Sequence, residues 1–335
     1  TLLVLYHLIY QTPLIPNRRA RTYGFLMVSL LPQFVMFSLY VSNDTAAIFL
    51  GNLATLQAWR YIQSPDRRQL ILLGAVTALG LLTKLTLLAY LPVFAGLVFW
   101  RNGRTRRAAV SALAFFTITF AAGSYKMVDN YLRFGQPMIT GLDPRFHNEN
   151  VLGHRASYRG LSSYLDVNVF KLVPNPVLSP STSGSYPVIL YATFWYQYVP
   201  ESSFIGNRKR PEMYLGSVIY IAALLPTVIF LIGCLAALRP IAAGAGAPDI
   251  ARWMSGLLLL LTGLIFTSAI IQNHAWSWAQ ARYLFPMMGA CLMAFAEGVR
   301  LVEHQRVLRV ALAACMWTLG ALFLIYFGRE CSRWL

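Results

Sequence analysis

Long apolar runs separated by short basic turns are the feature that most limits the fold of this chain. The runs recur from Leu2 to Phe327, and many approach the roughly 20 residues that a helix needs to cross a bilayer. Hydrophobic residues make up 57% of the chain and charged residues only 12%, a composition suited to a lipid solvent. The sequence therefore predicts an all-α polytopic membrane protein.

Counting the runs predicts about nine to ten transmembrane helices, one of them only partial. The runs are Leu2 to Tyr10 (the partial one), Tyr23 to Tyr40, Ala46 to Ile62, Leu70 to Trp100, Ala108 to Tyr125, Tyr214 to Leu238, Trp253 to Ile271, Tyr283 to Val299 and Val310 to Phe327. No basic region precedes the partial run in this sequence, so we do not expect it to be a signal peptide. We expect the chain to be N-terminally truncated, with its first spans missing.

The run from Leu70 to Trp100 is too long for one ordinary span, and only Thr83-Lys84 interrupts it. Arginines stand before and after this run, and the positive-inside rule places both of its ends in the cytoplasm. Two short spans joined as a helical hairpin satisfy both ends. The tip of this hairpin is predicted at Lys84, on the outer side of the membrane.

The formal net charge of +16 would suggest nucleic-acid binding in a soluble protein. Here the arginines stand beside apolar runs, where they set topology and meet anionic lipid headgroups. We therefore expect membrane lipids as partners and no nucleic acid. Three of the four cysteines, Cys234, Cys291 and Cys315, lie inside apolar runs, so they are interpreted as small buried residues and not as a disulfide framework.

Three regions follow from the spacing of the runs. Residues 1–128 form an N-terminal transmembrane bundle, residues 129–212 an extracytoplasmic loop domain, and residues 213–335 a C-terminal transmembrane bundle. Within the loop domain, Tyr186 to Tyr198 is apolar and aromatic enough to lie on the membrane surface. The same topology places the C-terminus outside the cytoplasm.

Asp44, Lys84 and Arg282 are far apart in the sequence, yet each falls at the outer end of a predicted span. Ionisable groups in a bilayer cost several kcal/mol unless they face protein or a water-filled cavity. The three residues are therefore candidates for one functional site on the outer face.

Each of the three candidates also has an ordinary structural interpretation. Lys84 would simply snorkel from the hairpin tip, and Arg282 would anchor its helix at the interface beside nearby tryptophans. Asp44 would cap a helix that starts at Thr45. His274 is interpreted more readily as an interface residue than as a base.

Five short segments occur in a fixed order along the chain. They are Ser42-Asn43-Asp44, Gly80-Leu81-Leu82-Thr83-Lys84, Asp129 to Pro137, Thr193-Phe194-Trp195-Tyr196 and Ala281 to Pro286. Taken together, they resemble the signatures of the GT-C superfamily of polytopic membrane glycosyltransferases, which includes protein O-mannosyltransferases and lipid A aminoarabinose transferases. The resemblance is strongest to a bacterial branch of that superfamily.

This resemblance implies transfer of a sugar from a lipid-phosphate donor, commonly a polyprenyl phosphate, at the extracytoplasmic face. It implies that Lys84 and Arg282 bind the donor phosphate and that Asp44 is a supporting catalytic carboxylate. The further substrate-binding residues that we predict are Asn43, Tyr283, Trp195 and His274. The principal catalytic acids of the resembled family lie on its first outer loop, and nothing in this chain corresponds to them.

The resemblance also implies the partners and the location. The partners are a lipid-linked sugar donor and a glycan, lipid or protein acceptor, and the location is a bacterial inner (plasma) membrane. An inverting transfer needs a general base and stabilisation of the leaving group, so we expect no cofactor, and a divalent metal is possible without being indicated.

Two other classes of function stay open. The first is a transporter or flippase for a lipid-linked or anionic solute, because transporters also place charges beside broken helices. The absence of visible inverted repeats and the position of the charges at one face argue against this class. The second is a non-catalytic scaffold in envelope assembly, whose outer cavity need not accommodate a lipid phosphate.

Overall fold

A computed structural model describes residues 1–11, 15, 17–39, 42–103, 105–137, 160–174, 176, 184–196, 210–240, 245–273 and 280–332. Within these ranges the regular elements are all helices, which confirms the predicted all-α class. Their order is α1 (Leu2–Tyr6), η1 (His7–Gln11), α2 (Arg18–Leu30), α3 (Pro32–Leu39), α4 (Asn43–Gln63), α5 (Arg67–Thr83), η2 (Leu85–Ala89), α6 (Tyr90–Arg101), α7 (Arg106–Gly123), α8 (Tyr125–Phe134), α9 (Leu161–Leu165), η4 (Val169–Leu172), α10 (Tyr186–Trp195), α11 (Arg210–Ala237), α12 (Ala247–Asn273), η6 (Ala281–Met287), α13 (Met288–Val302) and α14 (Arg306–Cys331).

Four stretches of helix in the described residues are long and apolar enough to cross a membrane. They are Tyr214–Ala237, Ala247–Ser268, Ala281–Val302 and Arg306–Arg329. Two bent pairs, α3 with α4 and α7 with α8, raise the number to six if each pair is one span. A membrane-embedded protein is thus supported. The larger number of nine to ten spans stays a prediction, because elements such as α5, with 17 residues, are shorter than a typical span.

The run from Tyr23 to Tyr40 is not one helix, contrary to the prediction. It divides into α2 and α3 at Leu31, whose backbone is extended, with φ −62° and ψ 112°. Pro32 follows directly, and a residue before proline is sterically disfavoured from the helical region. The proline thus ends α2 and begins α3.

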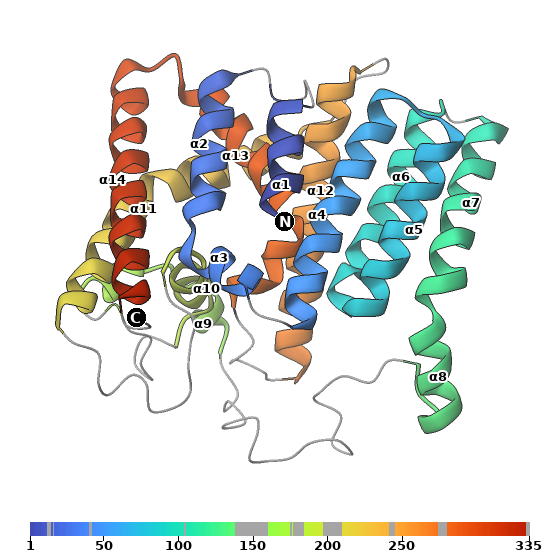
Figure 1. The fold of residues 1–335 in the computed structure, drawn as a ribbon, viewed down its shortest axis with the longest axis horizontal. Helices are drawn as coiled ribbons and strands as arrows, with labels where there is room; N and C mark the ends of the chain where they lie inside the picture. Colours follow the sequence, from blue (N-terminus) through green and yellow to red (C-terminus); the bar gives the residue numbers. More distant parts are fainter. Residues whose placement is uncertain are drawn as a thin grey trace.

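The predicted break at Lys84 is present. Lys84 ends α5 with an extended backbone, and its N–H donates to the carbonyl of Gly80 at 3.0 Å. η2 and α6 then lead back toward the end of the bundle where α5 begins (Figure 1). The run from Leu70 to Trp100 therefore turns at Lys84, as a hairpin requires.

The predicted loop domain, residues 129–212, begins within α8 and ends within α11. The division into three regions stays a prediction. Within this segment, α10 does not lie on a surface: Val188, Ile189 and Trp195 are buried, and the helix packs against α11, η6 and α3. An apolar aromatic segment is explained equally well by burial in protein, and hydropathy alone does not distinguish the two environments.

The span formed by η6 and α13 occupies the interior of the bundle. Its most apolar window is 89% buried, against 22% for the span in α14. α13 contacts α2, α4, α11 and α12, and it approaches α11 most closely where Gly298 faces Ile229 and Gly233 faces Ala294. This central position fixes the residues at the start of η6, which include Arg282.

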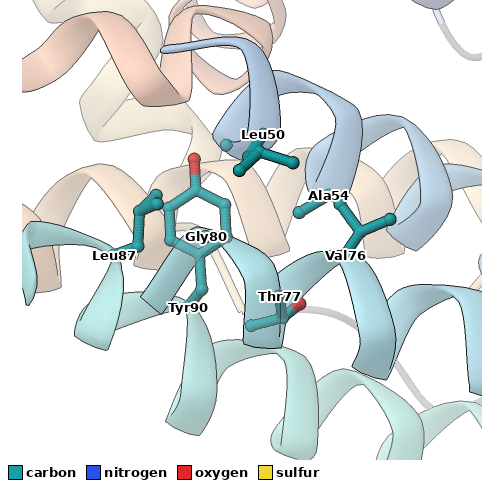
Figure 2. Close-up of a pocket in the computed structure, with 8 residues that line it drawn as sticks. Leu50, Ala54, Val76, Thr77, Gly80, Leu87 and Tyr90 are labelled. Atoms are coloured by element: carbon teal, nitrogen blue, oxygen red, sulfur yellow. The ribbon is translucent and has the colours of Figure 1, made fainter. Parts of the chain in front are cut away.

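A small apolar hollow lies between α4, α5 and the start of α6 (Figure 2). It has no space for even a water molecule, whereas ordinary ligand pockets measure roughly 300–1,000 Å³. Its lining includes Leu50, Val76, Leu87 and Tyr90. We interpret it as a packing void and not as a substrate site.

Candidate functional site

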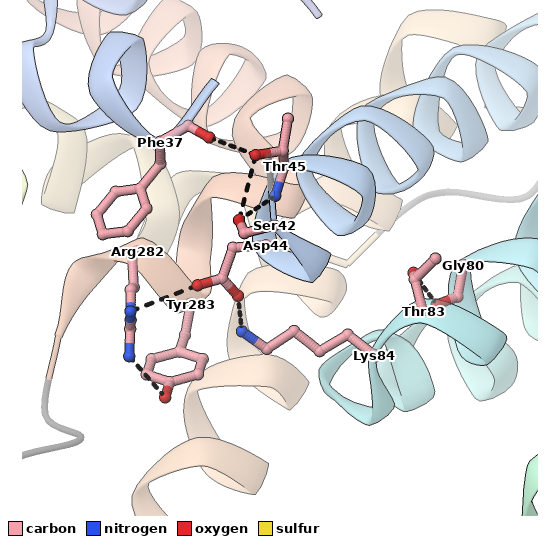
Figure 3. A network of polar contacts seen from close by, with 9 residues as sticks. All are labelled: Phe37, Ser42, Asp44, Thr45, Gly80, Thr83, Lys84, Arg282 and Tyr283. Atoms are coloured by element: carbon pink, nitrogen blue, oxygen red, sulfur yellow. Dashed lines mark hydrogen bonds and ion pairs between the residues drawn. The ribbon is translucent and has the colours of Figure 1, made fainter. Parts of the chain in front are cut away.

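The structure brings Asp44, Lys84 and Arg282 together, each from the end of a helix (Figure 3). Asp44 lies in the first turn of α4, Lys84 is the residue that ends α5, and Arg282 is the second residue of η6. All three positions are places where regular helix starts or stops. Their side chains therefore reach past the helix ends toward one another.

Asp44 contacts both cations. Its Oδ1 atom pairs with Lys84 Nζ, and its Oδ2 atom lies 3.4 Å from Nη1 of Arg282. The side chains of Asp44, Lys84 and Arg282 are 14%, 19% and 21% exposed. Two cations and one carboxylate leave a formal surplus of one positive charge, and the partial exposure leaves the group reachable from outside the protein.

Aromatic rings surround the two cations. Lys84 Nζ lies 4.5 Å from the centroid of the Tyr283 ring, and Arg282 Cζ lies 5.2 Å from the same centroid. Arg282 also lies over Phe37, with Cζ 5.5 Å from the ring centroid. Cations over aromatic faces are attracted by the ring quadrupole, more strongly when water is excluded. Phe37 was not predicted for this site, and nothing in its sequence context indicates it.

The start of α4 explains why Asp44 points at the cations. Ser42 is the N-cap residue, and its Oγ accepts a hydrogen bond from the N–H of Thr45 at 3.3 Å. The hydroxyl of Thr45 in turn donates to the carbonyl of Phe37 at 2.8 Å. Because Ser42 fills the capping role, the interpretation of Asp44 as the cap is wrong. The Asp44 carboxylate also gains from the positive end of the helix dipole.

Buried polar side chains hold the η6 segment that carries Arg282. Asn52 of α4 donates to the carbonyl of Phe285 at 2.9 Å and accepts from the N–H of Gly289 at 2.8 Å. The hydroxyl of Tyr90 donates to the carbonyl of Pro286 at 2.9 Å. Irregular backbone at membrane depth is tolerated only where protein satisfies its polar groups. These bonds therefore allow the 3₁₀ segment to exist inside the bundle.

Sequence reasoning missed Asn52 and Tyr90, although a signal for Asn52 was present. A lone amide inside the apolar run from Ala46 to Ile62 is an expensive residue in lipid, and such residues mark functional or structural contacts. Asn52 is completely buried, as expected for an amide that makes a structural contact. Tyr90 gave no comparable signal, because tyrosine is common in membrane helices.

The other predicted substrate-binding residues lie in different places in the structure. Tyr283 belongs to the cluster, as described above, whereas Asn43 is exposed at the first position of α4. The Trp195 side chain is buried, and its Nε1 donates to Thr227 of α11 at 2.8 Å. Its role in substrate binding stays a prediction. His274 lies outside the described residues.

Comparisons of the chain with protein-family models, with curated proteins and with solved structures found no match. The resemblance of its sequence segments to a glycosyltransferase superfamily therefore stays a prediction.

The chemistry of the cluster itself indicates what it can bind. Arginine offers a planar fork of donors suited to phosphate or carboxylate, and lysine adds a compact point charge. An anion with several oxygens can contact both Lys84 and Arg282, because one carboxylate already does so. Within the described residues no group of three or more His, Cys, Asp or Glu side chains is placed to hold a metal ion.

Proposed function

We propose that this protein is a membrane glycosyltransferase of the GT-C type, which moves a sugar from a polyprenyl-phosphate donor to an envelope acceptor at the extracytoplasmic face. The observation that carries the proposal is the meeting of Asp44, Lys84 and Arg282 at one end of the helical bundle. The order of the five sequence segments that resemble this superfamily supports it independently.

The ion pairs explain how a donor phosphate is bound. Asp44 holds the two cations close enough to share one anion, so little reorganisation is needed when a phosphate replaces the carboxylate. The acceptor hydroxyl oxygen then attacks the anomeric carbon and gives its proton to a carboxylate base, which the resembled superfamily carries on its first outer loop. The bond from the anomeric carbon to the phosphate oxygen breaks, and its electron pair stays on the phosphate. Lys84 and Arg282 stabilise the charge that develops on the departing phosphate.

Asp44 acts as a supporting carboxylate in this proposal. Once the phosphate occupies Lys84 and Arg282, the carboxylate is released to accept a hydrogen bond from the acceptor hydroxyl and orient it. The Tyr283 ring, which already packs on both cations, closes one side of the site. The proposal assigns the site to the outer face of a bacterial inner membrane, together with the segment from 129 to 212 and the C-terminus.

Binding of a polyprenyl phosphate tests the assignment of the two cations. The protein is reconstituted in nanodiscs, and the affinity for undecaprenyl phosphate is measured for Lys84→Ala, Arg282→Ala and the matched control Lys171→Ala, a lysine that also pairs with an aspartate. We expect each site variant to bind about tenfold more weakly, the usual loss for a charge-assisted hydrogen bond, with the control unchanged. Equal affinity in all three variants would contradict the phosphate site.

Transfer itself is tested with a radiolabelled polyprenyl-phosphate sugar and envelope extracts as the source of acceptor. Product that depends on Lys84 and Arg282 supports the transferase. Donor binding without product in any extract would leave the cations as a binding site and refute the enzyme.

A transporter is the second candidate, and the broken helices at Lys84 and Arg282 favour it specifically. In proteoliposomes a flippase moves a fluorescent lipid-linked sugar between leaflets without consuming it. Movement that stops in Arg282→Ala, with no glycosylated product, would establish transport in place of transfer. A protein that neither binds nor moves the lipid fits the scaffold interpretation.

A further inference from the structure

The helix α8 has its apolar side exposed. The exposed residues Tyr125, Val128, Tyr131 and Leu132 are 68%, 52%, 60% and 77% accessible. Positions 125, 128 and 132 are separated by three and four residues, so they lie along one face of the helix, with Tyr131 beside them. An apolar face of this size is not expected to stay in water.

The opposite side of α8 is polar. Lys126 and Arg133 both pair with Asp129, at 3.0 Å and 2.6 Å. Asn130, on the same side, is only 7% exposed and donates to the carbonyl of Pro137. α8 therefore exposes both its charged side and its apolar face, whereas a water-soluble helix covers its apolar face.

The open face of α8 follows an open apolar surface on α7. On α7 the exposed apolar residues include Val110, Leu113 and Phe120, and the exposed Tyr125 and Val128 come after them along the chain. Buried residues follow the opposite side of α7, at Phe115, Thr119 and Gly123. The exposed stripe of a membrane helix faces lipid, so the face of α8 begins where a lipid-facing surface ends.

The position of α8 at the end of the bundle suits the bilayer surface. α7 and α8 meet at Ser124 with a bend of 51°, and Gly135, with φ +72°, ends α8 in the left-handed conformation that favours glycine. In Figure 1, α8 extends beyond the neighbouring ends of α5 and α6. Three charged side chains in ten residues disfavour a place in the hydrocarbon core.

We propose that α8 is an interfacial helix whose apolar face, Tyr125, Val128, Tyr131 and Leu132, inserts into the headgroup and upper acyl region of the leaflet at the end of the bundle that carries Asp44. Tyrosines suit this region, since the ring is apolar and the hydroxyl is hydrated. Lys126 and Arg133 border the face and meet lipid phosphates while retaining their contact with Asp129. The partner is the lipid surface itself.

Spin-label accessibility tests the proposal on the whole chain. A cysteine-free version is reconstituted in vesicles of phosphatidylcholine and phosphatidylglycerol, and single cysteines are introduced at Leu132, at Val128 as a second position, at Lys126 on the polar side and at Leu113 on α7. Each label is probed by collision with oxygen, which concentrates in lipid, and with a water-soluble nickel chelate. Variants are compared only if they elute as one species.

We expect the ratio of oxygen to nickel collisions at Leu132 and Val128 to be severalfold higher than at Lys126 and severalfold lower than at Leu113. A ratio at Leu132 equal to that at Lys126 would mean that the apolar face is in water. A ratio equal to that at Leu113 would mean that α8 continues the span. An immobilised label shielded from both probes would mean that protein covers the face, and each of these three results overturns the proposal.

Discussion

At the scale of single residues, Asp44 is the centre of the candidate site. Its two oxygens face cations from α5 and η6, two segments separated by about two hundred residues of chain. A carboxylate placed between two partly buried cations keeps both in position and competes with any incoming anion. Binding of an anion and stabilisation of the empty site therefore depend on the same three side chains.

Replacing Asp44 with asparagine separates these roles. We expect Asp44→Asn to retain or strengthen affinity for a polyprenyl phosphate, because the competing charge is gone, and to lower turnover about tenfold or more, because the acceptor loses its carboxylate partner. Donor affinity and kcat are measured on the same preparation, with Asp129→Asn as a matched control. Weakened donor affinity with unchanged kcat would make Asp44 a binding residue only.

Asn52 gives a prediction about stability. Asn52→Leu keeps the size of the side chain but removes the buried amide that bonds the carbonyl of Phe285 and the N–H of Gly289, so we expect a loss of about 2 kcal/mol of unfolding free energy. The thermal unfolding midpoint in detergent should fall accordingly. Asn43→Leu, on the exposed first position of the same helix, serves as the control and should change the midpoint little. Equal midpoints for the two variants would contradict the supporting role of Asn52.

At the scale of elements, the close contact of α11 with α13 places the η6 segment. Gly298 and Gly233 face the carbonyl oxygens of Ile229 and Ala294, and a methyl group on either glycine would overlap a backbone atom that cannot move aside. Small residues at such crossings let helix backbones approach closely in membranes. The pair therefore fixes the depth of α13 and, through it, the position of Arg282.

Gly298→Ala tests this contact. We expect the variant to lose roughly 2–3 kcal/mol of unfolding free energy or to fail to assemble, since added volume in a close-packed crossing forces the backbones apart. Gly263→Ala in α12 is the matched control, because nothing lies within 4 Å of the position that its methyl group would occupy. The unfolding free energy of both variants is measured by denaturation in mixed detergent micelles. Comparable values would show that the backbones of α11 and α13 can move apart at little cost.

At the scale of the whole molecule, the two ends of the bundle differ in charge. The turns between α4 and α5, α6 and α7, and α13 and α14 lie at one end, and ten of the 24 arginines stand beside them (Figure 1). The Asp44 cluster lies at the start of α4, at the other end. Under the positive-inside rule the cluster then faces away from the cytoplasm.

Cysteine labelling in intact cells tests this orientation. Asn43→Cys and Ser64→Cys place thiols at the two ends of the same helix, and both native positions are exposed. In a cysteine-free background, a membrane-impermeant maleimide should label position 43 in intact cells and position 64 only after permeabilisation. The opposite pattern would invert the topology and move the cluster to the cytoplasm.

Much of the fold was predictable because hydropathy and helix ends are local properties. The apolar runs predicted the membrane class and the all-α architecture, and the arginine turns predicted the break at Lys84. Local patterns failed where two environments have the same composition, as for α10, whose Tyr191 and Trp195 are buried in protein and not spread on the bilayer. They also failed to anticipate Pro32 as the division between α2 and α3.

The sequence by itself determined that three ionisable residues lie at the ends of apolar runs, because lipid makes such positions costly in any fold. Only the tertiary structure decided that Asp44 pairs with both Lys84 and Arg282, that Asn52 supports η6, and that Trp195 is part of the core. These contacts depend on which helix faces meet across the bundle. That choice is made by the packing of distant segments, and no window of local sequence contains it.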